Sequence, residues 1–144
     1  MAIMNQELNN DYALYNGDCV EAMSAMKTGS VHLTVYSPPF AGLYQYSSDE
    51  RDMSNCIGHD EFFRHYGFCI DEIARLTMPG RMSAVHCMDI SLSNSGCDAM
   101  FDLPGRIIAE YEARGFASGG RRVIWKEPLM VRNRTMMKSL HHST

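Results

Sequence analysis

A pair of adjacent prolines ends the best-defined β-prone run in the chain. Residues 31–36 are β-branched or aromatic at most positions, and Ser37-Pro38-Pro39-Phe40 follows directly. Proline has no backbone N–H and a fixed φ, so the hydrogen-bond ladder of a sheet cannot continue through two of them. We therefore expect a strand over residues 31–36 that leaves its sheet at Ser37.

Helical and β-prone patterns alternate along the rest of the chain. Apolar spacing predicts a short helix with Val20, Met23 and Met26 inward, a long helix capped by Asp60 and closed at residues 78–80, and a third helix from Pro104 to Arg114. Further strands are expected at residues 12–16, 82–88 and 122–125, with polar loops at 41–58 and from 89 through 100. This order is typical of an α/β fold with a mostly parallel sheet.

Length and charge limit the class of protein. A chain of 144 residues with 45% hydrophobic residues is enough for one core. The net charge is −4, but residues 1–120 carry seven basic against sixteen acidic side chains, whereas residues 121–144 carry six against one. The pattern is an acidic body with a basic tail. The chain lacks an apolar run of about 18 residues and a signal-peptide pattern, so no membrane partner is expected.

The cysteines favour a reducing compartment and no metal site. Five cysteines are present, which is an odd number, and they are widely spaced without a Cys-x-x-Cys pair. Cys56, His59, His65 and Cys69 do not match a recognised zinc-ligand spacing. We expect a cytoplasmic protein without a bound metal.

The Ser37–Phe40 segment has the chemistry of a nucleobase site. The two prolines hold their carbonyls rigidly, carbonyl oxygens can accept an exocyclic amino group, and Phe40 offers a flat face for stacking. In open α/β sheets ligands bind beyond the carboxyl ends of the strands, where Gly17-Asp18 and Ser37–Phe40 are both expected. From these residues alone a second interpretation stays open, in which the prolines only end a strand and Phe40 packs in the core.

Three segments together carry a family resemblance, and they lie at residues 14–19, 29–33 and 37–40. They resemble the N-terminal half of amino-methylating DNA methyltransferases, in the permuted subgroup where the (D/N/S)-P-P-(Y/F/W) motif precedes the cofactor glycine loop. The continuation through Gly42-Leu43-Tyr44, Pro79-Gly80-Arg81 and residues 86–89 is similar to a phage and mobile-element branch. The resemblance implies an incomplete Rossmann-like methyltransferase fold, with residues 1–144 as its catalytic-motif part, and a setting such as restriction–modification.

The resemblance also implies roles for single residues. Ser37 and the Pro38 carbonyl would hold the target amino group, with Pro39 fixing the turn and Phe40 stacking on the extruded base. Asp18 and Cys19 would contact S-adenosylmethionine. The remaining candidates are basic residues expected to bind DNA, namely Arg132, Arg134 and Lys138.

Two departures from the family pattern limit the prediction. Ser37 is compatible with either adenine N6 or cytosine N4 as target. No F-x-G-x-G loop for the methionine part of the cofactor occurs in the sequence, so we expect the chain to be inactive alone.

Missing strands would leave an apolar edge, so we expect a second copy or a missing C-terminal half as partner. A non-catalytic remnant stays an alternative. An unrelated nucleotide-binding domain is disfavoured, because no G-x-G-x-x-G or G-K-(S/T) loop is present.

Overall fold

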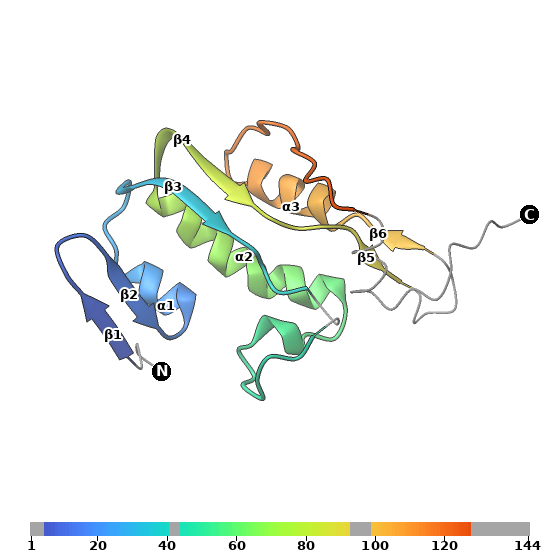
Figure 1. The fold of residues 1–144 in the computed structure, drawn as a ribbon, viewed down its shortest axis with the longest axis horizontal. Coiled ribbons are helices and arrows are strands. Elements are labelled where there is room, and N and C mark those ends of the chain that lie inside the picture. Colours follow the sequence, from blue (N-terminus) through green and yellow to red (C-terminus); the bar gives the residue numbers. More distant parts are fainter. Residues whose placement is uncertain (1–4, 41–43, 93–98, 128–144) are drawn as a thin grey trace, which may run out of the picture.

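The computed structural model describes residues 5–40, 44–92 and 99–127. Along these residues the elements follow in an α/β order (Figure 1). They are β1 (Asn5–Leu8), β2 (Ala13–Asn16), α1 (Cys19–Ser24), β3 (Val31–Tyr36), the 3-10 turn η1 (Met53–Asn55), α2 (His59–Leu76), β4 (Thr77–Val85), β5 (Ile90–Ser91), β6 (Met100–Phe101) and α3 (Leu103–Glu112). The predicted α/β class is confirmed.

Strand pairing within the described part is limited to three pairs. β1 and β2 form an antiparallel hairpin, β3 and β4 pair in parallel, and β5 and β6 form a short antiparallel pair. Helix α2 connects β3 to β4 and, with α3, lies behind this parallel pair in Figure 1. The β3–α2–β4 unit is therefore the parallel crossover that the sequence predicts.

The core is built on one face of α2. Phe62, Tyr66 and Ile70 are fully buried at 0% exposure, and they pack with Leu103 and Ile107 of α3. The helix begins after Gly58, whose φ is 87°, and not after Asp60 as predicted. Asp60 and Glu61 instead lie in the first turn of α2, where the positive end of the helix dipole stabilises a carboxylate.

Strand β4 begins earlier and ends earlier than expected. It starts at Thr77, passes through Pro79 and Gly80, and ends at Val85, whereas the sequence predicted a strand over residues 82–88. Val31 pairs with Thr77 but Leu33 pairs with Met82, so the strand is irregular between these pairs. This irregularity accommodates Pro79, which lacks an N–H for the ladder, and Gly80, whose φ is 76°.

The predicted strand at residues 122–125 is wrong. This segment has no strand pairing, and Val123 and Trp125 are 93% and 78% exposed. A β-prone sequence becomes a strand only when a neighbouring edge completes its hydrogen bonds. The polar start of the chain was in turn not predicted to be a strand, although β1 pairs with β2 along its whole length.

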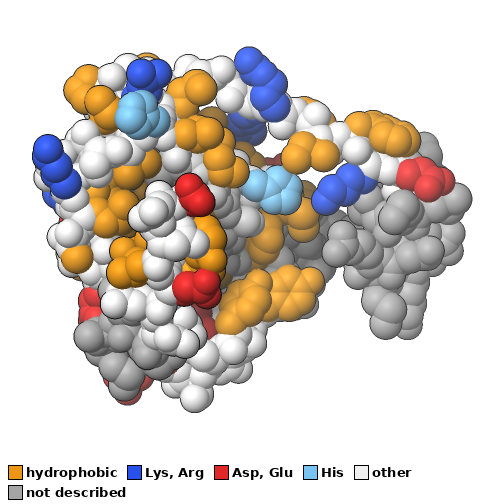
Figure 2. All heavy atoms as spheres, turned by 60° about the vertical axis from the view of Figure 1, so that its left-hand side comes forward, with side chains coloured by type: hydrophobic (Ala, Val, Ile, Leu, Met, Phe, Trp, Pro, Cys, Tyr) orange, Lys and Arg blue, Asp and Glu red, His pale blue; other side chains and the backbone are white. Residues whose placement is uncertain are grey.

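One face of the β3–β4 pair lacks a covering layer within the described residues. Thr34 and Tyr36 point to the helices, whereas Leu33, Val35 and Met82 are 53%, 70% and 69% exposed. Figure 2 shows hydrophobic side chains open on this side of the molecule, among histidine and basic side chains. Parallel strands normally have both faces covered, so this surface is unusual. No helix among the described residues is long and apolar enough to span a membrane.

Candidate functional site

The Ser37–Phe40 segment lies at the carboxyl ends of the two parallel strands. The backbone N–H of His86 donates to the Tyr36 carbonyl at 2.9 Å, which extends the β3–β4 ladder by one step. The Ser37 hydroxyl then donates to the His86 carbonyl at 2.8 Å. Ser37 itself is exposed. The end of β3 and the end of β4 are thus joined by the first side chain of the motif.

The next three residues of the motif pass from the core to the surface. Pro38 is buried, whereas Pro39 and Phe40 are half-buried. Phe40 packs against the core cluster built on α2. The structure thus shows the core packing of Phe40, and part of the side chain is accessible to solvent, whereas stacking on a base stays a prediction.

Three hydrogen-bonded tyrosines, one of which is Tyr36, lie next to this segment. The Tyr36 hydroxyl bonds with that of Tyr66 on α2, and with that of Tyr111 on α3 at 2.6 Å. Tyr111 also contacts the Ser83 hydroxyl at 3.1 Å. Burial raises the pKa of all three phenols, so they stay neutral and act as hydrogen-bonding groups. This cluster fixes Tyr36, the last residue of β3.

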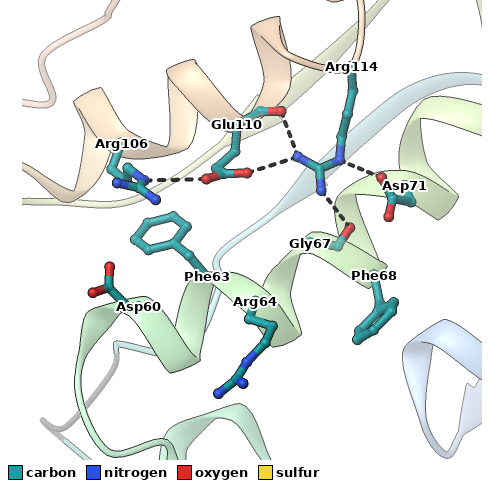
Figure 3. A pocket seen from close by; sticks show the side chains of 9 residues that line it. All are labelled: Asp60, Phe63, Arg64, Gly67, Phe68, Asp71, Arg106, Glu110 and Arg114. Carbon is teal, nitrogen blue, oxygen red and sulfur yellow. Dashed lines mark hydrogen bonds and ion pairs between the residues drawn. The ribbon is translucent and has the colours of Figure 1, made fainter.

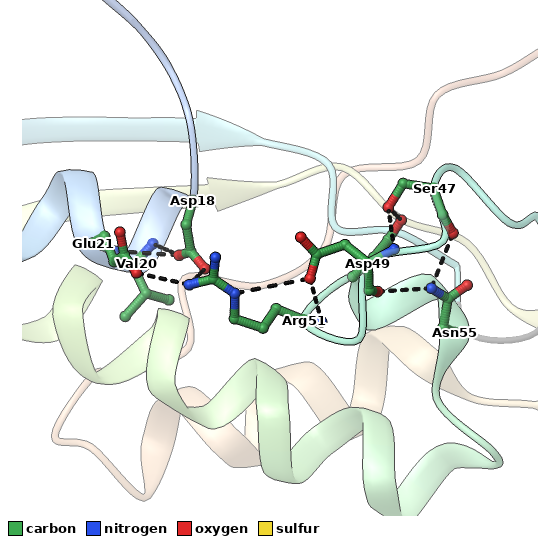
Figure 4. A network of polar contacts seen from close by, with 8 residues as sticks. Asp18, Val20, Glu21, Ser47, Asp49, Arg51 and Asn55 are labelled. Atoms are coloured by element: carbon green, nitrogen blue, oxygen red, sulfur yellow. Dashed lines mark hydrogen bonds and ion pairs between the residues drawn. The ribbon is translucent and has the colours of Figure 1, made fainter. Parts of the chain in front are cut away.

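Asp18 lies at the end of β2, as predicted, and caps α1. Its carboxylate accepts the backbone N–H of Val20 at 2.9 Å and that of Glu21 at 3.2 Å. The other carboxylate oxygen lies 3.6 Å from the Arg51 guanidinium (Figure 4). The side chain is 23% exposed, so a ligand can still reach it.

Arg51 links the loop after the motif back to Asp18. Its guanidinium forms a 2.7 Å ion pair with Glu21 and lies 3.8 Å from Asp49 (Figure 4). The loop is held by its own contacts as well, since Asn55 donates to the carbonyls of Ser47 and Asp49. Within residues 5–40 and 44–92, no hydrogen bond or ion pair joins Asp18 directly to the motif. No role of Arg51 was predicted from the sequence, because its partners are set by the path of the loop.

Cys19, the other predicted cofactor residue, is exposed at the first position of α1. The neighbouring Cys69 thiol of α2 lowers the pKa of Cys19 to about 7. The thiolate of Cys19 is therefore easier to form than that of an ordinary cysteine. Arg132, Arg134 and Lys138, predicted to bind DNA, lie outside the described residues.

A groove between α2 and α3 is separate from the candidate site. It has a volume of about 350 Å³ and is lined by side chains such as Phe63, Phe68 and Arg106 (Figure 3). The Arg114 guanidinium in it is fully engaged by Asp71 and Glu110. None of its lining residues belongs to a strand end. In the ranges that the structure covers, no cluster of three or more His, Cys, Asp or Glu side chains could hold a metal ion.

No protein-family model and no curated protein matches the chain. The chain does match solved structures. The chain is similar to TTHA0409 of Thermus thermophilus, provisionally assigned as a DNA modification methylase and solved in complex with S-adenosyl-L-methionine, with 27% identity and a TM-score of 0.56 over 70% of this chain. The selenomethionine derivative of TTHA0409 gives 26% identity and a TM-score of 0.53 over the same share.

The similarity covers only part of the solved protein. The chain spans 40% of the length of TTHA0409 in the complex and 37% in the selenomethionine derivative. The fold therefore agrees with the predicted resemblance to DNA methyltransferases. The permuted subgroup, the phage branch and the roles of single residues stay predictions.

Proposed function

We propose that residues 1–144 form the catalytic-motif part of a DNA methyltransferase that transfers a methyl group from S-adenosylmethionine to adenine N6 or cytosine N4. The observation that carries the proposal is the position of Ser37–Phe40 directly after a parallel strand, in a fold similar to a methylase solved with S-adenosyl-L-methionine. The position is the one at which open α/β sheets bind ligands.

The hydrogen bond from Ser37 to His86 supports the role of Ser37. Because the hydroxyl proton is directed to the His86 carbonyl, the lone pairs of Ser37 Oγ are available as acceptors. An exocyclic amine is a poor nucleophile, since its lone pair is delocalised into the base. Acceptors at Ser37 Oγ and at the Pro38 carbonyl would draw the nitrogen toward tetrahedral geometry and aim its lone pair at the methyl group.

The base must leave the duplex to reach this segment, which costs a few kcal/mol. The accessible part of Phe40 would offset some of this cost by stacking, because its other part is already fixed against the core. No covalent intermediate with the enzyme is required, so none of the cysteines acts as a nucleophile in this proposal.

The described residues fit one edge of the cofactor. Asp18 is fixed by two backbone N–H groups, and its accessible carboxylate can accept hydrogen bonds from the adenosine part. Cys19 lies beside it. S-adenosylmethionine would supply the methyl group as an electrophilic sulfonium. The sequence contains no F-x-G-x-G loop for its methionine part, so we infer weak binding and no methyl transfer by the chain alone.

Calorimetric titration with S-adenosylhomocysteine, with and without DNA, tests the proposal. We expect weak but measurable binding of S-adenosylhomocysteine, and Asp18→Ala should reduce the affinity at least about tenfold. Glu50→Ala, in the loop that carries Arg51, should leave the affinity unchanged. Circular dichroism of each variant controls for folding. Absence of binding to the folded chain would contradict the cofactor site.

A non-catalytic interaction module is the second candidate. It is favoured by the uncovered face of β3 and β4 and by the 40% coverage of TTHA0409. In this case the partner would be a second copy of the chain, another methyltransferase chain, or DNA bound through the basic tail. Binding to DNA or to a second chain without any affinity for S-adenosylhomocysteine would favour this candidate.

A further inference from the structure

Two cysteines lie side by side where α1 packs on α2. The Arg75 guanidinium donates to the Met23 carbonyl at 2.8 Å and to the Met26 carbonyl at 2.9 Å, which fixes the C-terminal end of α1 beside Arg75. At 1.5 Å per residue, Cys19 precedes Met23 by about 6 Å and Cys69 precedes Arg75 by about 9 Å. The two helices run in the same direction (Figure 1), so this register places Cys19 and Cys69 at similar heights, about 3 Å apart along the helix axes.

Side-chain packing agrees with this register. Met23, one turn after Cys19 on the same face of α1, packs against the core cluster that contains Cys69. The two thiols lie close enough that each shifts the pKa of the other, and neither forms a disulfide. Cys19 is exposed, whereas Cys69 is 6% exposed. One thiol of the pair is therefore open to solvent reagents, and the other is largely shielded from them.

The acid–base properties of the pair are unequal. The contact with Cys69 lowers the pKa of Cys19 to about 7, and the same contact raises the pKa of Cys69. The proton thus stays on the buried sulfur, and the thiolate forms on the exposed one. A thiolate is the form of cysteine that reacts with peroxides.

We propose that Cys19 and Cys69 are an oxidation site for hydroperoxides, at which the two thiols close to a disulfide. With hydrogen peroxide, the Cys19 thiolate attacks one oxygen and the O–O bond breaks, which gives a sulfenic acid and, after protonation of the leaving oxygen, water; an organic hydroperoxide releases the alcohol at this step instead. The Cys69 sulfur then attacks the Cys19 sulfur, the S–O bond breaks, and hydroxide leaves with the Cys69 proton as a second water. Two thiols are oxidised by two electrons and one peroxide is reduced.

The site also bears on cofactor binding, a step that rests on the proposed function. Cys19 directly follows Asp18, whose carboxylate caps α1 through the N–H groups of Val20 and Glu21. A bond from Cys19 to α2 fixes the first turn of α1 and removes the thiolate beside Asp18. We expect the disulfide to lower affinity for S-adenosylhomocysteine at least about fivefold, reversibly with dithiothreitol.

Peptide mapping tests the pair without reference to function. The reduced chain is treated with hydrogen peroxide, blocked with iodoacetamide and digested with trypsin without reductant. Tryptic peptides 1–27 and 65–75 contain Cys19 and Cys69 as their single cysteines, Cys56 lies in peptide 52–64, and Cys87 and Cys97 share peptide 82–106. We expect a cross-link between peptides 1–27 and 65–75, with a loss of about 2 Da relative to the two thiol peptides.

Matched variants decide the assignment. Cys19→Ser should abolish the cross-link and leave Cys69 reduced, whereas Cys56→Ser should leave the cross-link unchanged. A peroxide-treated chain in which peptides 1–27 and 65–75 stay separate overturns the proposal, as does a cross-link that forms equally well to peptide 52–64. If the cross-link forms but the reduced chain does not bind S-adenosylhomocysteine, the oxidation site stands and the proposed function fails.

Discussion

The Ser37 hydroxyl donates a 2.8 Å hydrogen bond to the backbone carbonyl of His86. This contact joins two residues 49 positions apart in the sequence, at the ends of the two parallel strands. It orients Ser37 Oγ with its lone pairs away from β4. The side chain is thus placed as a hydrogen-bond acceptor by the pairing of β3 with β4 and not by the local sequence alone.

Ser37→Ala should slow methyl transfer strongly while leaving cofactor binding unchanged. The variant removes one acceptor for the target amine, a loss of about 10²–10³ in kcat for a group of this kind. The measurement is single-turnover transfer from labelled S-adenosylmethionine to DNA, in an enzyme whose cofactor loop is supplied in cis or by a second chain. Equal activity of the variant would assign the role to the Pro38 carbonyl alone.

Two substitutions of Phe40 separate stacking from packing. Phe40→Leu keeps apolar volume against the core but removes the flat ring, so it should abolish methylation at a stability cost below about 1.5 kcal/mol. Phe40→Ala should abolish methylation and also lower the free energy of unfolding by about 1–2 kcal/mol, because the ring is half-buried. Urea denaturation and the transfer assay measure the two effects. An active Phe40→Leu enzyme would disprove stacking.

The elements predicted correctly from the sequence are those that local residue patterns determine. Helix α2 was predicted from apolar spacing along its sequence, and β3 was predicted because the prolines after it allow only one end point. The ion pair of Arg51 with Asp18 and the contact of Cys19 with Cys69 were not predictable, since each depends on how distant segments pack.

The error at residues 122–125 has the same origin. Val123 and Trp125 have β-prone side chains, but no neighbouring strand pairs with them in the described part of the chain. A periodic pattern indicates which element a segment can form, and the presence of a neighbouring strand edge determines whether a strand forms.

The tyrosine cluster predicts a loss of stability at alkaline pH. The folded-state pKa of Tyr36, Tyr66 and Tyr111 is raised above the ordinary value near 10, so the fold favours the neutral phenols. The corresponding stability is fully present below about pH 10 and is lost as the pH rises further. Urea denaturation at pH 8, 10 and 11 should show this decrease.

Phenylalanine variants assign the alkaline effect to the cluster. Tyr36→Phe leaves the hydroxyls of Tyr66 and Tyr111 without a shared partner and should cost about 1–3 kcal/mol at pH 8. Its further loss between pH 8 and 11 should be smaller than that of the unmodified chain. Tyr46→Phe, at an exposed tyrosine, is the control and should behave like the unmodified chain. An identical pH dependence in all three proteins would contradict the assignment.

The uncovered face of β3 and β4 predicts association. Leu33 and Met82 are neighbours in the parallel register and both are more than half exposed. Burial of apolar surface contributes about 25 cal/mol per Å², so a second chain on this face would be stabilised without any change in the fold. Sedimentation velocity over about 10–200 µM, a range set by weak association constants, should therefore show a concentration-dependent dimer. Leu33→Glu should shift it to monomer, because a carboxylate placed on this face would have to be desolvated.

The control for this prediction lies on a different surface of the molecule. Phe68 is 61% exposed in the groove between α2 and α3, so Phe68→Glu adds the same charge to another apolar surface. It should leave the dimer unchanged if β3 and β4 form the interface. A monodisperse monomer at every concentration would contradict the predicted association through this face.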